Sequence, residues 1–208
     1  MRIVVMGANG RTGRHVVEQA QARGHHVTAV GRRLETLPEP HAGLSVATAD
    51  VLDRDAVAAV LFQADAVVSA VGIGSSRRPT SVYSRGAENL LAGLTPGLSQ
   101  KLVVVSAAPV GPRAEHSPLQ RRVVLPLLDR VFGASYEDMR RMEAVLLDSS
   151  ADWVALRPSR LANGAATGRY RLGPRPLPHA RSIRYPDLAT ALLDSIDRLT
   201  RTTVYVSN

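Results

Sequence analysis

The stretch that decides the fold of this chain is RIVVMGANGRTG, residues 2–13. Four consecutive apolar residues, Ile3–Met6, predict a strand that is buried on both faces. Residues 14–23, which follow the stretch, carry apolar side chains at helical spacing. We therefore expect a strand, a glycine-rich turn and a helix, in that order.

Three glycines occupy the turn in a GxxGxxG spacing. Glycine lets the backbone bend tightly and approach a ligand closely, and the helix that follows directs free N–H groups and the positive end of its dipole at the turn. A pyrophosphate is the expected occupant, and a glycine turn without a ligand is the alternative. The residues predicted to bind it are Gly7, Asn9, Gly10, Arg11, Thr12 and Gly13.

The 208 residues suffice for one domain, which we take to span residues 1–208. The chain has no cysteine, and its six histidines lack metal-ligand spacing, so we expect neither disulfides nor a metal site. No apolar run is long enough to span a membrane, and the first residues enter a strand without a signal peptide. These features predict a cytoplasmic protein with no membrane partner.

The formal net charge is +8, which raises the question of a nucleic-acid partner. Lys101 is the only lysine, and the arginines are spread over the whole length, which indicates a compositional bias as much as a binding surface. Two phenylalanines and one tryptophan offer little for base stacking. Nucleic acid is therefore disfavoured as a partner, and a small anionic ligand fits the charge at least as well.

Short apolar strands alternate with helical patterns along the whole chain. The further predicted strands are His26–Val30, Leu44–Ala47, Ala64–Val71, Lys101–Val105, Trp153–Leu156 and Thr203–Val206. The further predicted helices are one capped by Asp53, Thr80–Leu94 ended by Pro96-Gly97, Tyr136–Leu147 and Tyr185–Leu199. This alternation predicts an α/β fold with a doubly wound parallel sheet, the Rossmann architecture, in a single domain.

Two stretches break the alternation. Residues 109–135 are interrupted by Pro112, Pro118 and Pro126 and show no clear periodicity, which is typical of a functional lid or binding loop. We name residues 109–135 the lid segment. Residues 164–177 are rich in Gly, Arg and Pro, and we expect a short hairpin there around Tyr170.

Ligands of such sheets bind at the carboxyl ends of the strands, so the residues that follow each strand are the candidates. An NAD site usually has an acid after the second strand, where it accepts from the ribose 2′-hydroxyl. Here Arg32 and Arg33 follow Gly31, and the first acid is Glu35. Two guanidiniums suit a 2′-phosphate, with Arg11 as a third contact, so we predict NADPH. Solvated surface arginines are the alternative.

Two further strand ends complete the predicted cofactor site. Asp50 and Val51 follow the third strand, where a carboxylate can accept from the adenine amino group; helix capping shared with Asp53 is the alternative. Val71 and Gly72 follow the fourth strand, in a loop that continues to Ser76 and is expected along the cofactor ribose; a flexible loop without a ligand is the alternative.

With these residues in place, the chain resembles the atypical short-chain dehydrogenase/reductases, the NAD(P)H-binding group with NmrA-like proteins. The narrower motifs are similar to the branch of flavin reductase and biliverdin reductase B. The matching stretches are residues 7–13, 50–51, 65–68, Ser84–Leu90, Arg141–Glu143, Trp153–Pro158, Thr167–Tyr170 and Ile183–Leu188. The resemblance implies NADPH as hydride donor and a flat, conjugated acceptor such as a flavin, a quinone or a linear tetrapyrrole.

Two departures argue against tetrapyrrole reduction in particular. The branch tends to carry successive hydroxyl residues after the fifth strand, whereas here Ala107 follows Ser106. It also carries a histidine after the sixth strand, whereas here the residues are Arg157, Pro158 and Ser159. An arginine cannot exchange a proton at neutral pH. Arg157 and Pro158 are predicted to bind the cofactor; for Arg157, the possible partners are the substrate, the nicotinamide amide or simply an acid.

The catalytic candidates are Ser106, Tyr136 and Arg140. The wider superfamily uses a Tyr-x-x-x-Lys pair as its acid, and Tyr136 with Arg140 has that spacing on one helix face. A tyrosine packed at a helix start is the alternative. Ser106 leaves the fifth strand at the site, where its hydroxyl is predicted to bond the nicotinamide or the acceptor.

Three hypotheses for function follow. The first is an NADPH-dependent reductase of a conjugated small molecule, and the second is a non-catalytic NADP(H) sensor of NmrA type that binds a partner protein. The third is a redox-neutral isomerase or cyclase. The sequence leaves a monomer and a homodimer equally open.

Overall fold

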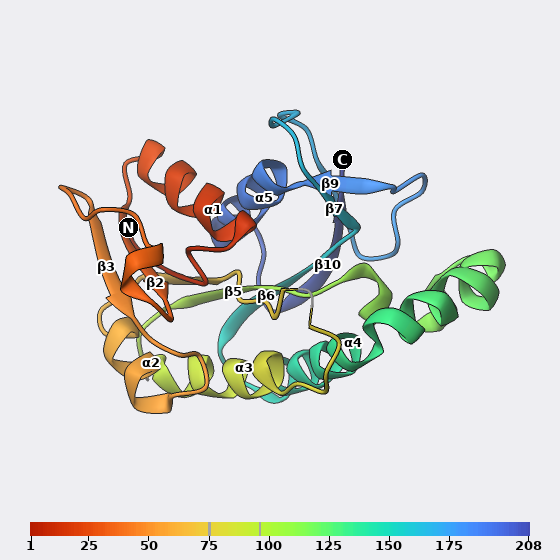
Figure 1. The fold of residues 1–208 in the computed structure, drawn as a ribbon, viewed down its shortest axis with the longest axis horizontal. Coiled ribbons are helices and arrows are strands. Elements are labelled where there is room, and N and C mark those ends of the chain that lie inside the picture. The colour runs from red at the N-terminus through yellow and green to blue at the C-terminus, as the bar shows by residue number, and fades with distance from the viewer. Residues whose placement is uncertain (75, 96) are drawn as a thin grey trace.

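The computed structural model describes residues 1–74, 76–95 and 97–208, and within them one large sheet lies between two layers of helices (Figure 1). The strand order in the sheet is β3-β2-β1-β4-β5-β6-β10-β8. All neighbours are parallel except β8, which runs antiparallel to β10. The strands are β1 (Arg2–Met6), β2 (His26–Gly31), β3 (Leu44–Thr48), β4 (Ala66–Ser69), β5 (Lys101–Val105), β6 (Asp152–Pro158), β8 (Arg171–Gly173) and β10 (Thr202–Ser207). The predicted α/β doubly wound sheet is confirmed.

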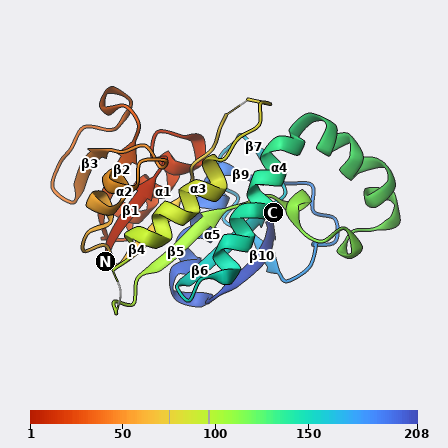
Figure 2. The same ribbon diagram turned by 90° about the horizontal axis from the view of Figure 1, so that it is seen from below.

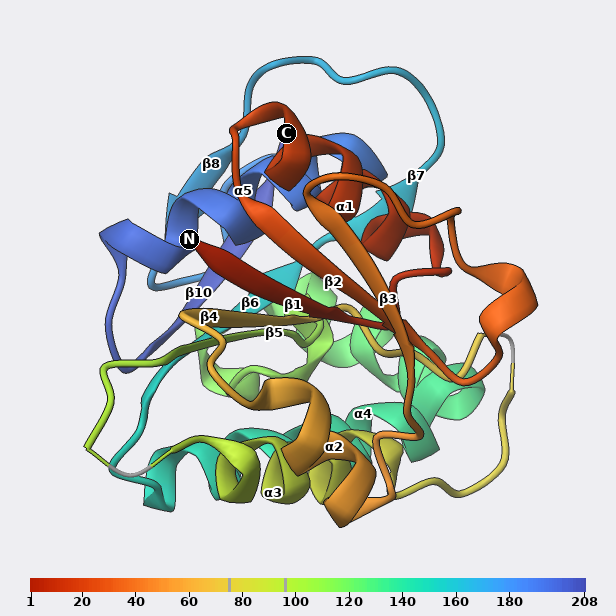
Figure 3. The same ribbon diagram turned by 90° about the vertical axis from the view of Figure 1, so that its left-hand side faces the viewer.

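Helices cover both faces of the sheet (Figure 3). Helices α1 and α5 pack together on one face, and α2, α3 and α4 line the other face, where Figure 2 shows them in front of the strands. The helices are α1 (Arg11–Ala22), α2 (Arg54–Leu61), α3 (Val82–Gly93), α4 (Leu125–Asp148) and α5 (Tyr185–Arg198). Both sides of β1 are therefore buried: Ile3 and Val5 face one core, and Val4 and Met6 face the other. Among the described residues, no helix is long and apolar enough to cross a membrane.

Most predicted boundaries agree with the structure to within a few residues. Asp53 caps α2, because its carboxylate accepts hydrogen bonds from the backbone N–H groups of Asp55 and Ala56, each at 3.1 Å. Helix α1 begins at Arg11, inside the glycine motif and three residues earlier than predicted. Two residues of predicted loops, Ser75 and Pro96, lie outside the described residues.

The lid segment was predicted to be irregular, and this prediction is wrong for most of its length. It contains 3₁₀ turns at Ala108–Val110 and Arg113–Glu115, then a π-helical turn, Gln120–Val124, that runs directly into α4. Helix α4 therefore begins at Leu125 and not at Tyr136. Pro126 does not break it: the proline directly follows the π-helical turn, an irregularity of the kind at which a helix accommodates a missing N–H, and the chain stays helical on both sides. The result is a long helix whose amino-terminal part projects from the body (Figure 1).

The predicted hairpin around Tyr170 is also wrong. Strand β8 pairs with β10, while β7 (Arg160–Ala162) pairs in parallel with β9 (Ser182–Arg184). The loop between β7 and β8 is held instead by Asp187, which accepts hydrogen bonds from the N–H and hydroxyl of Thr167 and from the side chain of Asn208. Asp187 is almost completely buried at the start of α5.

At the amino ends of the central strands, Lys101 opens β5 with a buried side chain. Its Nζ lies 2.5 Å from the Asp152 carboxylate and donates to the carbonyl of Leu199 at 2.6 Å. The charge of the only lysine is therefore neutralised within the fold, at the amino ends of β5 and β6.

Candidate functional site

The glycine turn brings β1, α1 and the end of β4 into backbone contact. Gly7 has a φ of +77°, and a Cβ there would lie 2.9 Å from the carbonyl oxygen of Ala70. A Cβ on Gly10 would lie 3.2 Å from the Gly7 oxygen, and a Cβ on Gly13 would overlap that same oxygen. No side chain other than hydrogen fits at Gly13 without moving α1 away from β1.

The amino end of α1 has the features of an anion site. Gly10 caps the helix in an extended conformation without a side-chain hydrogen bond, and the first turn contains no acid. Thr12 and Gly13 are buried in that turn. The first N–H groups of the helix have no intrahelical acceptor, so they and the helix dipole remain to bind a phosphate. The residues therefore fit the pyrophosphate of a dinucleotide.

The loop after β2 lies beside the glycine turn. The Asn9 amide donates to the hydroxyl of Thr36 at 3.1 Å and so links the turn to the 3₁₀ turn Leu34–Thr36. Arg32 and Arg33 are exposed at the end of β2. Their charges are therefore accessible to a ligand at the carboxyl edge of the sheet.

Arg11, the predicted third contact, is oriented by another residue. Its guanidinium lies 5.6 Å from the ring centre of Tyr185 and donates to that hydroxyl at 3.3 Å. Tyr185 is the first residue of α5. The structure therefore assigns Arg11 a partner at α5, and its contact with the 2′-phosphate stays a prediction.

Asp50 and Val51 play different parts in the loop after β3. The Asp50 carboxylate is exposed and accepts from the N–H of Leu52 at 3.0 Å, a local turn separate from the Asp53 cap. Val51 is buried: its carbonyl accepts from the Asn89 amide at 2.9 Å, and a Cβ on Gly86 would lie 2.9 Å from its side chain. The matching stretch Ser84–Leu90 on α3, through Gly86 and Asn89, therefore fixes the loop that was predicted to meet the adenine.

The loops after β3 and β4 meet at one apolar crevice. Val51 and Val71 both line it, together with Tyr83, Gly86 and Met142. Gly72 lies next to it, since a Cβ there would lie 3.9 Å from the Tyr83 hydroxyl. The structure thus brings together the residues predicted for the adenine and the ribose, which lie about twenty residues apart in sequence.

A buried polar network lies where β5 and β6 end. Ser106 donates to Glu143 at 2.7 Å, and Glu143 accepts two hydrogen bonds from Arg157. Arg157 also donates to the Tyr205 hydroxyl at 3.3 Å, and that hydroxyl donates to Glu115 at 2.8 Å. The alternative of an acid partner for Arg157 is thereby confirmed. Ser106 is only 2% exposed, so almost none of its surface is accessible to a ligand in this structure. Its contact with the nicotinamide or the acceptor stays a prediction.

The network shifts the pKa of its members. Burial lowers the pKa of Arg157, but the hydrogen bonds and charge of Glu143 outweigh it, so the net shift is upward. Burial and then the hydrogen bond to Glu115 raise the pKa of Tyr205. Burial lowers the pKa of His116, whose Nε2 has no hydrogen-bond partner among the described residues. The network therefore keeps Arg157 charged and Tyr205 protonated at neutral pH.

Sequence reasoning missed Glu143, Tyr205 and Glu115 as members of this network. Glu143 falls in one of the matching stretches, and that was the only available signal. Pro158, predicted to bind the cofactor, is buried at the end of β6 beside β10. Its contact with the cofactor stays a prediction.

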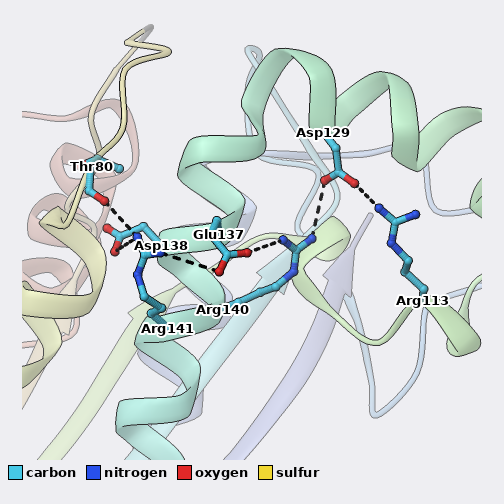
Figure 4. Close-up of polar contacts among 7 residues, drawn as sticks. All are labelled: Thr80, Arg113, Asp129, Glu137, Asp138, Arg140 and Arg141. Carbon is cyan, nitrogen blue, oxygen red and sulfur yellow. Dashed lines mark hydrogen bonds and ion pairs between the residues drawn. The ribbon is translucent and has the colours of Figure 1, made fainter.

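Tyr136 and Arg140 do not form an acid pair in this structure. Arg140 donates to Glu137 at 3.3 Å and lies 3.6 Å from Asp129, so its charge is already compensated (Figure 4). Tyr136 packs against Phe132, with ring centres 5.9 Å apart. Burial and then the charge of Asp129 raise its pKa, whereas a cationic partner in the lysine place would lower it. The structure therefore does not support the prediction that Tyr136 and Arg140 act together as a general acid.

The same contacts continue along α4 as a chain of alternating charges (Figure 4). Arg113 pairs with Asp129, and Arg141 bonds Asp138 and the Thr80 carbonyl. Asp138 is fully buried and accepts from the N–H of Tyr83 at 2.8 Å, so it caps α3 from a neighbouring helix. This row of alternating charges connects the lid segment to α3, the helix that carries Ser84–Leu90. Among the residues that the structure describes, no group of His, Asp and Glu could hold a metal ion.

Comparison with known proteins agrees with this geometry. Residues 7–198 match the NAD(P)H-binding family. YwnB of Bacillus subtilis (strain 168) is 26% identical over 95% of this chain and 92% of its own. The solved structure of SP1627 from Streptococcus pneumoniae TIGR4, a candidate NADH-flavin reductase, superposes with a TM-score of 0.78 at 22% identity, covering 100% of this chain and 99% of that one. ChuY of Escherichia coli O157:H7, an anaerobilin reductase, gives a TM-score of 0.80 at 21% identity, covering 100% and 97%. The chain belongs to the NAD(P)H-binding family.

Proposed function

We propose that the protein is an NADPH-dependent reductase that transfers hydride to a flat, conjugated small molecule such as a flavin or a quinone. The observation that carries the proposal is the glycine turn. Its glycines let the turn pack closely against β4 and let α1 pack closely against β1, and the amino end of α1 carries no side-chain cap, so its N–H groups can bind a pyrophosphate. The descriptions of two structural neighbours, a candidate NADH-flavin reductase and an anaerobilin reductase, support an acceptor of the conjugated class.

NADPH is proposed over NADH because the end of β2 carries positive and no negative charge. Arg32 and Arg33 are exposed there, and Glu35 is the first acid. A 2′-phosphate can accept charge-assisted hydrogen bonds from either guanidinium, whereas a ribose 2′-hydroxyl finds no carboxylate to accept its proton.

The class of hydride acceptor is proposed because Tyr136 and Arg140 do not form a general acid. Bound NADPH supplies the hydride. The chain supplies placement, which alone accounts for a large part of such a rate, and no general acid is assembled from Tyr136 and Arg140. A ketone needs a proton as its alkoxide forms, whereas a reduced flavin or quinone takes its proton from water afterwards. Conjugated acceptors are therefore favoured over aliphatic ketones.

A second candidate function is a sensor that binds NADP(H) without turning it over. The observation in its favour is that the hydroxyl proton of Ser106 is committed to Glu143 within a buried network. Under this alternative the lid segment contacts a partner protein instead of a small-molecule acceptor.

Stopped-flow mixing of the protein with NADPH and a panel of FMN, FAD, a benzoquinone and an aliphatic ketone tests the proposal. We expect oxidation of NADPH with at least one flavin or the quinone, and none with the ketone. Tight NADPH binding by calorimetry with no oxidation in any arm would favour the sensor instead. Absence of binding would reject both.

A further inference from the structure

Tyr205 lies at the centre of the contacts between the lid segment and the sheet. It belongs to β10 and pairs in register with Arg157 of the neighbouring β6. Its hydroxyl donates to Glu115 at 2.8 Å, and its ring meets the ring of His116 edge-on, with centres 6.3 Å apart. Gly111 packs so closely that a Cβ there would overlap the Tyr205 hydroxyl. Three residues of the first part of the lid segment thus contact one side chain.

Tyr205 is in turn held by the buried network beneath it. Arg157 donates to its hydroxyl at 3.3 Å and lies 5.2 Å from its ring centre. Arg157 is bound by Glu143, which also binds Ser106 at the end of β5. Residues 111–116 are therefore held in place relative to the ends of β5 and β6 by the Tyr205 hydroxyl. This hydroxyl accepts a hydrogen bond from the buried Arg157 and donates one to the exposed Glu115.

The two hydrogen-bond partners of the Tyr205 hydroxyl, Arg157 and Glu115, differ in what each would lose without it. Arg157 keeps two hydrogen bonds to Glu143 when the hydroxyl is removed, so it stays compensated. Glu115 is exposed, so it can turn to water at little cost. Removing the hydroxyl should therefore release the lid segment while the fold persists.

We propose that Tyr205 is a positioning residue that sets where residues 111–116 lie over the carboxyl ends of β5 and β6, and thereby sets the affinity for the hydride acceptor. This inference rests on the proposed reductase function. It assigns Tyr205 no contact with the nicotinamide, so the binding of NADPH alone should not depend on it.

Tyr205→Phe tests the proposal, with Tyr170→Phe as the matched control. Tyr170 also donates a hydrogen bond to a carboxylate, that of Asp194 at 2.6 Å, but does so on α5, away from the lid segment. We expect Tyr205→Phe to raise the KM for the acceptor by about tenfold, the equivalent of about 1.4 kcal/mol, with the Kd for NADPH unchanged. Tyr170→Phe should alter only the melting temperature. The proposal would be overturned if both variants lowered the melting temperature equally and neither changed the KM for the acceptor.

Glu115→Ala approaches the same contact from the lid side. Because both variants break one interaction, the double variant Tyr205→Phe/Glu115→Ala should raise KM no further than either single variant. Fully additive effects would mean that the two residues act separately and would contradict the inference.

Hydrogen exchange of residues 109–118 provides a readout that needs no acceptor. We expect faster exchange there in Tyr205→Phe than in the wild type, and unchanged exchange in Tyr170→Phe. Faster exchange with no NADPH oxidation in the wild type would reject the reductase function and leave the positioning contact standing. Turnover with unchanged exchange and unchanged KM would reject the positioning role alone.

Discussion

Arg157 binds Glu143 through two hydrogen bonds, from Nε to Oε1 at 3.0 Å and from Nη2 to Oε2 at 2.6 Å, and both side chains are about nine-tenths buried. A buried pair of this kind adds little over a well-packed apolar pair, but the loss of one partner leaves an uncompensated charge. Replacing either Glu143 or Arg157 alone should therefore destabilise the fold more than replacing both.

Glu143→Gln or Arg157→Met should each lower the free energy of unfolding by about 3–5 kcal/mol. For a domain of this size, the melting temperature should fall by roughly 6–20 °C. Calorimetry of both variants checks this. The double variant Glu143→Leu/Arg157→Met should lose less than either single one, and a larger loss in the double variant would contradict the argument.

The double variant Arg32→Ala/Arg33→Ala should weaken NADPH binding by about tenfold or more and leave NADH binding nearly unchanged, since charge-assisted hydrogen bonds are worth about 1.5–3 kcal/mol. Calorimetric titration with both cofactors measures the change. Arg121→Ala/Arg122→Ala is the control, because it removes the same charge from two adjacent, exposed arginines of the lid segment. Equal losses for NADPH and NADH would show that Arg32 and Arg33 do not read the 2′-phosphate.

Gly13→Ala should destabilise the protein and abolish dinucleotide binding, because its Cβ overlaps the Gly7 carbonyl that α1 packs on. Gly10→Val should abolish NADPH binding with a smaller loss of stability. Thermal melts and titration with NADPH check both. A folded Gly10→Val protein with intact affinity would place the cofactor elsewhere.

Gly133→Ala is the matched control for that pair. A Cβ there meets nothing within 4 Å, and the residue lies inside α4. Helix propensity then predicts a gain of stability of up to about 1 kcal/mol, with unchanged NADPH binding.

Asp187 makes the stability of the fold depend on acid pH. Burial acts to raise the pKa of its carboxyl, but the hydrogen bonds from Thr167, Asn208 and Gly168 outweigh burial and lower it below the ordinary value of 3.8. A depressed pKa contributes stability that is present above the unfolded value and is lost as the pH falls through the folded one. The stability difference between the wild type and Asp187→Asn should therefore be full at neutral pH and shrink below about pH 4.

Urea denaturation at a series of pH values measures that difference. Asp197→Asn, an exposed site on the same helix, should show little difference from the wild type at any pH. A difference for Asp187→Asn that stays constant down to pH values well below 3.8 would contradict a depressed pKa.

Tyr136→Phe should leave the turnover of flavin or quinone nearly unchanged. Its hydroxyl has a raised pKa, and Arg140 is bound to Glu137 and Asp129. Steady-state rates with NADPH check this. Robust ketone reduction that disappears in Tyr136→Phe would show that Tyr136 and Arg140 do work as an acid pair.

Much of the fold follows from local sequence pattern. The central strands β1, β4 and β5 are short, mostly apolar runs that the fold buries, and the GxxGxxG turn needs glycine for reasons that include contacts within a few residues. The start of α4 was missed because Pro126 was interpreted as a helix breaker, whereas the chain enters it from a π-helical turn and stays helical.

The candidate site was predictable at the strand ends and not beyond them. Position after a strand is enough to place Arg32, Val51 or Ser106 at the carboxyl edge. It cannot reveal which partners meet there, because contacts such as Tyr205 with Glu115 join residues 90 apart in sequence. The hairpin predicted around Tyr170 is wrong for the same reason: β8 pairs with the distant β10, and the N–H of Thr167 donates to Asp187, 20 residues away.

The burial of Lys101 has a practical consequence for chemical labelling. The chain has no thiol, and its single lysine amine is enclosed between Asp152 and Leu199. Amine-reactive dyes should therefore leave Lys101 unmodified in the folded protein. A maleimide probe should attach solely at a cysteine introduced by design, so that a single fluorophore on the exposed Val123 could report on the lid segment without background.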